Sequence, residues 1–208
     1  FNRAQHFVLG YDYSITENLR IKAETYFQSL TQLPVTPVPS SFNMINSGAD
    51  FLMPYVDSLL SKGSGTNYGI EFTLEHFMTK GFYFLFTNSL FESKYKGSDG
   101  IERNTAFNGR FVSNLLFGKE FSIGKNNTLS IDVKVAYAGG RRYSPVDLEK
   151  SKMAGFAVFD ASRAYENQFP EYFRPDIRIG FRQNLKHLTQ EWAISIQNFV
   201  GHKNAYTI

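Results

Sequence analysis

The amino-acid sequence predicts an all-β fold built from antiparallel strands. Phe and Tyr dominate the aromatic residues, with 21 and 12 copies in 208 residues, and both types favour strands over helices. Apolar and polar residues alternate along several stretches with the period of two that is typical of a half-buried strand. Tight turns and long polar segments separate these stretches in strict alternation, which indicates a series of hairpins.

The clearest predicted strand lies within residues 128–142. Its odd-numbered positions from Leu129 to Tyr137 are apolar, and the positions between them include Asp132 and Lys134. A charged side chain in the middle of such a strand is costly to place against hydrocarbon. We therefore expect Asp132 and Lys134 to face water or each other.

The first two predicted strands, residues 4–15 and 19–30, show the same contrast of faces. The second strand alternates apolar residues with Arg20, Lys22 and Glu24. Three charges within five residues on one face are incompatible with a packed apolar core, whereas a water-filled lumen accommodates them. Further strands are predicted at residues 68–78, 82–95, 110–123, 176–186 and 192–197.

Long connections are predicted at residues 31–67, 96–109 and 142–174. The first contains Pro34, Pro37, Pro39 and Pro54, which keep it from forming a central strand. Near-helical spacing of apolar residues predicts a short helix within residues 49–60.

Together these features predict about eight strands of roughly 10 to 13 residues, near the length that crosses a bilayer when tilted. Alternating short and long connections place all tight turns at one end of the sheet. We therefore predict a segment of an antiparallel up-and-down transmembrane β-barrel, with short periplasmic turns and long extracellular loops. A soluble β domain would instead have an apolar inner face and a polar outer face.

Composition and charge narrow the class further. The formal net charge of +3 without a run of Lys or Arg argues against a nucleic-acid partner. The chain has no cysteine, and its apolar runs fall far short of the roughly 18 residues of a transmembrane helix. It opens with FNRAQHFVLG, without an initiator Met or a leader pattern, so we expect a mature or excised segment.

Three stretches resemble the C-terminal barrel of TonB-dependent outer-membrane receptors. GSGTNYGIEF (residues 63–72) is similar to the family's glycine-led entry into a strand, and AGGRRYSPVD (138–147) to its strand end running into an extracellular loop. ISIQNFVGHKNAY (194–206) resembles the family's penultimate strand and the loop that follows it. The resemblance covers nearly the whole chain.

The resemblance implies that residues 1–208 form one segment of a barrel of about 22 strands. The plug domain and the last strand are not part of this segment. The receptor would lie in the outer membrane of a Gram-negative bacterium and take up a scarce nutrient such as an iron chelate, a vitamin or a glycan. Its partners would be outer-membrane lipid, the plug domain, the remaining barrel strands, the small-molecule nutrient, and TonB through the missing N-terminal part.

Loop aromatics and arginines are the candidate substrate-binding residues. They are Phe51 and Tyr55 in the first long loop and Arg141, Arg142 and Tyr143 at the start of the third. Arginine beside tyrosine offers charge-assisted hydrogen bonds and a stacking face, which suits an anionic or ring-bearing solute. Alternatively, such a tyrosine belongs to the interfacial aromatic girdle, and such an arginine anchors to phosphates of the lipid surface.

The sequence predicts no enzyme activity, no cofactor, no catalytic residue and no metal site. The four histidines lie far apart, and no G-x-S-x-G motif frames a serine. Two other hypotheses stay open at this point. One is a self-contained small outer-membrane barrel with a structural or adhesive role, and the other is an outer-membrane barrel enzyme such as a lipase or protease.

Overall fold

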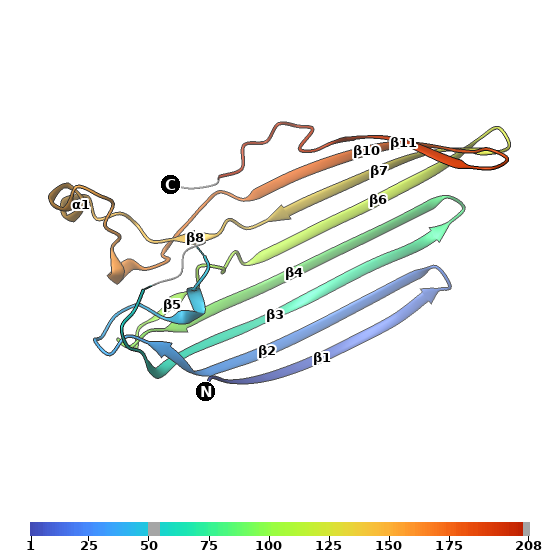
Figure 1. Ribbon diagram of the computed structural model, residues 1–208. Helices are drawn as coiled ribbons and strands as arrows, with labels where there is room; N and C mark the ends of the chain where they lie inside the picture. Colours follow the sequence, from blue (N-terminus) through green and yellow to red (C-terminus); the bar gives the residue numbers. More distant parts are fainter. Residues whose placement is uncertain (50–54, 206–208) are drawn as a thin grey trace.

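The protein forms one long antiparallel sheet with its loops gathered at one end (Figure 1). The computed structural model describes residues 1–49 and 55–205. Within these residues, eight long strands follow one another in up-and-down order, which confirms the predicted all-β arrangement. They are β1 (Arg3–Thr16), β2 (Leu19–Val35), β3 (Leu60–Thr79), β4 (Phe82–Lys96), β6 (Phe111–Ile123), β7 (Asn127–Ala138), β10 (Tyr172–Asn184) and β11 (Thr189–Ile196).

The short elements all belong to the long connections. A 3-10 turn, η1 (Met44–Asn46), lies in the first connection, and β5 (Glu102–Asn104) pairs with the end of β4 in the second. The tight turns between the long strands lie at the opposite end of the sheet (Figure 1). The third connection contains four short elements. These four are β8 (Arg142–Tyr143), α1 (Leu148–Ala154), η2 (Ala161–Arg163) and β9 (Asn167–Gln168), with β8 pairing with β9.

Two strands are longer than the sequence predicted. Strand β2 continues through Pro34 to Val35, and β3 begins at Leu60, so the first connection shrinks to residues 36–59. Pairing of β2 with β1 stops at Thr31, which leaves Pro34 on an unpaired edge where its missing N–H is tolerated. A register shift around Gln32, whose φ is +58°, marks a bulge at this point.

The helix predicted within residues 49–60 is wrong for the part that the structure describes. Residues 55–59 have no helical structure, and Leu60 already belongs to β3. Residues 50–54 lie outside the described residues. The helical turn of this loop forms earlier, at η1, where the side chain of Asn43 accepts a hydrogen bond from the Ile45 amide.

The register gives the sheet one apolar and one polar face across its width. Paired residues of antiparallel strands point to the same face. One row of paired positions runs through Tyr13, Ile21, Leu74, Phe86, Leu115, Val135 and Pro175. The adjacent row, on the other face, runs through Asp12, Lys22, Thr73, Thr87, Asn114, Ala136 and Arg174.

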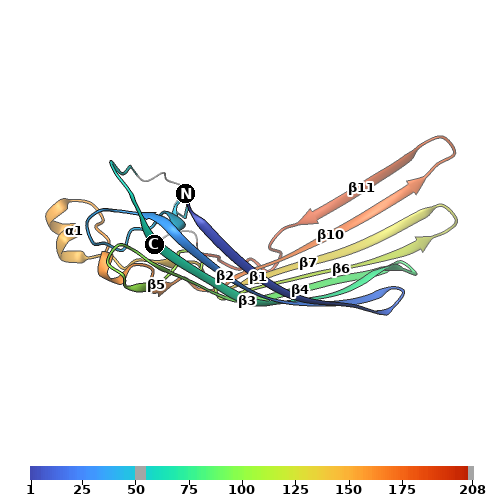
Figure 2. The ribbon, with the colours of Figure 1, turned by 90° about the horizontal axis from the view of Figure 1, so that it is seen from below.

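The apolar face is uncovered over the long strands. Leu9, Ile70 and Ile194 are 74%, 60% and 70% exposed, although all three lie on this face. Figure 2 shows the strands as a single twisted layer. Apart from Pro175 of β10, the buried apolar residues of the described chain lie instead at the loop end, and they are Leu33, Val35, Tyr95, Ala106 and Ala164. The strands therefore have no apolar core of their own.

Ion pairs link neighbouring strands on the polar face. Arg20 of β2 pairs with Asp12 of β1 and reaches Glu75 of β3 at 3.8 Å. Arg178 of β10 lies between Asp132 of β7 and Glu191 of β11. Its guanidinium nitrogens are 3.5 and 2.5 Å from a carboxylate oxygen of each. Such pairs satisfy the charges of a polar, hydrated surface.

Tyr83 and Gly118 form a close contact between β4 and β6 on this polar face. The two residues are directly paired, and the Tyr83 hydroxyl donates a hydrogen bond of 2.8 Å to Asp132 of β7. A Cβ atom on Gly118 would lie 2.0 Å from Cε1 of the Tyr83 ring. Glycine at position 118 therefore makes room for the ring to lie across the strand.

We predict that Gly118→Ala lowers the free energy of unfolding of the complete protein by about 1–3 kcal/mol, because the Tyr83 ring must move. Thermal unfolding in detergent, followed by circular dichroism, measures the effect. Gly10→Ala is the matched control on the same face, because its Cβ would meet only the Glu24 side chain at 3.3 Å. Equal melting temperatures for the two variants would contradict the prediction.

Candidate functional site

The three long connections meet at one end of the sheet and share a polar interior. The buried polar residues of the described chain lie there, and they are Asn43, Asn46, Arg103, Thr105, Asn108 and Arg142. Their side chains tie one loop to another. Buried polar groups need hydrogen-bond partners, and the bonds that these residues form hold the loops in a defined geometry.

Several hydrogen bonds fasten the first loop to the second. Asn43 donates a hydrogen bond of 2.9 Å to the Lys96 carbonyl, and the Ser40 amide donates one of 3.0 Å to the Ser98 hydroxyl. The Oδ1 atom of Asn46 accepts a hydrogen bond of 2.9 Å from the Ala106 amide. These contacts position η1 and the residues on either side of it.

The second loop is held by an ion pair within itself. Arg103 donates hydrogen bonds of 3.0 and 2.8 Å to the two carboxylate oxygens of Asp99. Burial raises the pKa of Asp99, but the hydrogen bonds from Arg103 and from backbone amides, together with the positive charge of Arg103, outweigh this effect, and the pKa lies below its ordinary value. The carboxylate therefore stays ionised at neutral pH and keeps the loop closed.

Arg142 connects the second and third loops. Its side chain is buried, and its guanidinium donates hydrogen bonds of 3.1 Å each to the carbonyls of Asn108 and Glu166. Its backbone amide donates to the Ala106 carbonyl at 3.0 Å. Burial, reinforced by the charge of Arg110, lowers the pKa of Arg142 below its ordinary value.

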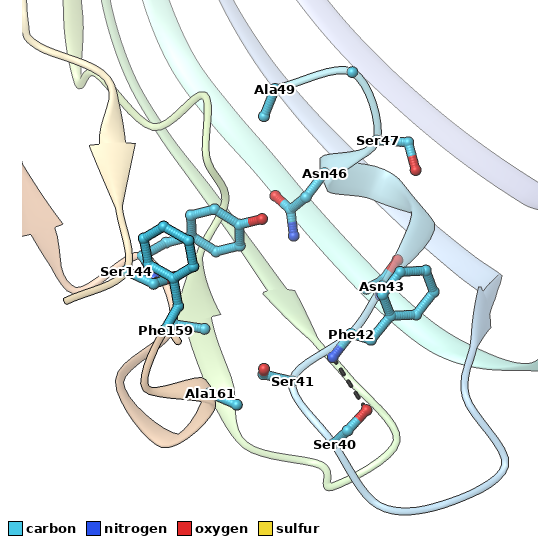
Figure 3. Close-up of a pocket in the computed structure, with 13 residues that line it drawn as sticks. Ser40, Ser41, Phe42, Asn43, Asn46, Ser47, Ala49, Ser144, Phe159 and Ala161 are labelled. Atoms are coloured by element: carbon cyan, nitrogen blue, oxygen red, sulfur yellow. Dashed lines mark hydrogen bonds between the residues drawn. The ribbon is translucent and has the colours of Figure 1, made fainter. Parts of the chain in front are cut away.

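A pocket of about 410 Å³ lies between the first and third loops. Figure 3 shows Asn46, Ser41, Ser144 and Phe159 arranged around this space, with the first loop on one side and the third on the other. The described residues that line it are Ser40, Ser41, Phe42, Asn43, Asn46, Ser47, Gly48, Ala49, Ser144, Phe159, Ala161, Ala164 and Tyr165. The lining thus combines hydroxyl groups, amides and aromatic rings.

None of the four described residues predicted from the sequence, Tyr55, Arg141, Arg142 and Tyr143, lines this pocket. Arg141 donates a hydrogen bond of 3.0 Å to the carbonyl of Ala49, a lining residue, and lies 5.5 Å from the centre of the Phe169 ring. Tyr143 packs against the same ring, and the centres of the two rings lie 4.5 Å apart. Tyr55 is 95% exposed, and Phe51 lies outside the described residues. Their contact with a solute stays a prediction.

Asn46, Ser41, Ser144 and Phe159 were missed by the sequence analysis. Small polar residues are common in loops, and neither a motif nor a periodic pattern marks these four positions. Only the packing of η1 against the second loop brings Asn46 opposite residues of the third. No residue pattern could have identified the pocket in advance.

Across the described parts of the chain, no group of three or more His, Asp or Glu side chains is placed to hold a metal ion. None of the described helices has the length and apolar character to cross a membrane. No protein-family model, curated protein or solved structure matches the chain.

We predict that Arg142→Met loosens the loop end, because the carbonyls of Asn108 and Glu166 lose their buried donors. The expected loss of stability is about 1–3 kcal/mol. Hydrogen–deuterium exchange should become faster in residues 106–109 and 164–168. Lys152→Met is the control, because this side chain is 72% exposed in the same connection. Unchanged exchange in Arg142→Met would show that the guanidinium does not hold the loops together.

A second prediction concerns the stability of the second loop at low pH. A carboxyl whose pKa is lowered on folding stabilises the folded state fully above its unfolded pKa of about 3.9, and this contribution is lost as the pH falls through the lower folded value. We therefore expect residues 97–104 to open below about pH 4. Hydrogen exchange at the Ile101 and Arg103 amides, corrected for the intrinsic rate, measures this opening. The same pH profile in Asp99→Asn would exclude the Asp99–Arg103 pair as its cause.

Proposed function

We propose that this chain forms part of the wall of an outer-membrane β-barrel receptor that takes up a scarce nutrient. The observation that carries the proposal is the uncovered apolar face that extends over eight consecutive strands. The resemblance to TonB-dependent receptors in three stretches supports the more specific assignment to that family. An energised receptor of that family would couple to TonB through a plug domain.

The exposed apolar face fits a lipid environment. Moving a large apolar side chain from water into hydrocarbon is favourable by about 1.5–3 kcal/mol. Over the width of this sheet, the sum is far larger than the stability of a typical domain. In water, such a surface would instead drive aggregation. Lipid is the solvent in which this face is stable.

A charged residue on the apolar face also fits a bilayer. Lys119 lies on this face, paired with Phe82 and Ile131. Its ammonium group reaches the tight-turn end of the sheet, where it donates a hydrogen bond of 3.1 Å to the Lys80 carbonyl. A lysine near a membrane surface places its charge in the interface while its stem stays in hydrocarbon.

The polar face fits a hydrated lumen. It is hollowed by two pockets of about 490 and 260 Å³, which are lined mainly by polar and charged residues of this face. Cross-strand ion pairs such as Arg182 with Glu120, at 3.2 Å, belong to this surface. A lumen filled by water and a plug domain would keep these groups solvated.

The sheet edges favour a larger barrel over a closed small one. In the described residues, β1 pairs only with β2, and β11 pairs only with β10. All fourteen residues of β1 are exposed. A long unpaired edge invites further strands, and in a membrane every backbone N–H and C=O needs a partner. The remaining strands of the receptor would supply these partners.

Site-directed spin labelling of the complete protein in lipid vesicles tests the proposal. Ile194→Cys places a label on the apolar face of β11, and Ala193→Cys and Ser195→Cys place labels on the polar face of the same strand. We expect the label at 194 to be accessible to oxygen dissolved in lipid. The labels at 193 and 195 should be accessible to a nickel chelate in water.

A label at position 194 that the nickel chelate reaches as easily as its neighbours would overturn the membrane proposal. A further distance measurement separates the large receptor from the small barrel. If β1 and β11 paired directly, the backbones of facing residues would lie about 5 Å apart, so a label at Val8 of β1 would be close to one of the labels placed at successive positions along β11. A clearly larger separation supports a wall that other strands complete.

A further inference from the structure

The described lining of the pocket between the first and third loops is uncharged. The thirteen described residues that line it include no Asp, Glu, Lys, Arg or His. The guanidinium of Arg141 lies nearby, but it donates to the carbonyl of Ala49 and lies over the Phe169 ring. An anionic solute would need a positive partner to offset the loss of its hydration. The lining offers no such partner.

Two hydrogen-bonding groups of the lining are available to a solute. Asn46 is only 8% exposed, and its Oδ1 atom accepts a hydrogen bond from the Ala106 amide. This bond holds the side chain in place. Among the described residues, neither the Nδ2 group of Asn46 nor the hydroxyl of Ser41 has a hydrogen-bond partner. Figure 3 shows both side chains beside the central space. An amide donor and a hydroxyl complement neutral hydroxyl groups.

Aromatic rings supply the second kind of contact. Phe159 and Tyr165 of the third loop line the pocket, and Tyr165 is held edge-on against the buried Tyr95 ring at 6.1 Å. Aromatic faces pack against the apolar face of a ring-shaped solute, while its polar rim forms hydrogen bonds. A volume of about 410 Å³ lies in the range of small-molecule sites.

We propose that this pocket binds a neutral, polyhydroxylated ring compound of the saccharide class. Asn46 and Ser41 would form hydrogen bonds to its hydroxyl groups, and Phe159 would pack against its C–H face. The inference rests on the proposed function for the step of uptake, because it names the class of solute that the loops of the receptor capture. It excludes an anionic iron chelate as the occupant of this pocket.

Calorimetry on the complete protein in detergent tests the inference. The probes are neutral hexasaccharides of glucose, mannose, galactose and xylose, with ferric citrate as the anionic probe. At least one neutral hexasaccharide should bind, and Phe159→Ala should weaken its binding about tenfold. Asn46→Asp should weaken it to a similar extent, because the new carboxylate still accepts from the Ala106 amide but has no donor to offer the sugar.

Phe156→Ala is the matched control. Phe156 is a 69% exposed phenylalanine in the same connection, and it does not line the pocket. Its Kd should stay within about twofold of the parent value. Melting temperatures of all variants, measured in the same detergent, separate lost binding from lost folding.

Three results would overturn the inference. They are no binding of any neutral hexasaccharide, sugar binding that Phe159→Ala and Asn46→Asp leave unchanged, and ferric citrate binding that these two variants abolish. The spin-label pattern on β11 does not depend on the solute. A negative sugar experiment with a positive spin-label pattern would therefore reject the saccharide pocket and leave the membrane receptor standing.

Discussion

The sheet depends on one side-chain register held across all eight long strands. Because side chains alternate between faces, a slip of one residue in any strand would move its apolar set to the polar face. The register shifts of the first strands lie near strand ends, between Ser14 and Thr16, around Gln32, and between His76 and Thr79. The paired middle of the sheet is therefore regular. This regularity makes one face predominantly apolar and places most of the strand charges on the other.

A sheet without its own apolar core must obtain its stability from other sources. Backbone hydrogen bonds, cross-strand side-chain contacts and favourable solvation of each face stabilise the strands. The loop end works differently, because it encloses buried polar groups such as Asn108 and Arg142. Such groups are costly unless each finds a partner, so the arrangements available to the loops are few. The two ends of the molecule therefore differ in the physical origin of their order.

The strands could be predicted from the sequence because period-two alternation is a local property of each strand. Residues 127–138 alternate clearly, and their face assignment follows directly. Prolines misled the prediction for β2, since Pro34 lies where β1 no longer pairs. The pocket depends on contacts between residues far apart in sequence, such as Asn46 with Ala106. Local patterns contain no information about such contacts.

The AGGRR stretch shows why a loop arginine is hard to interpret from sequence. A Cβ on Gly139 would lie 1.7 Å from the Gly109 carbonyl oxygen, and one on Gly140 would lie 2.0 Å from that of Phe169. These glycines let three backbone segments approach closely, and Arg142 then bonds to carbonyls that the approach has brought together. A guanidinium recognises a carbonyl of its own chain by the same hydrogen bonds that it would offer a solute. Its residue type therefore indicates an acceptor nearby, and only the surrounding packing decides whether that acceptor belongs to the protein or to a ligand.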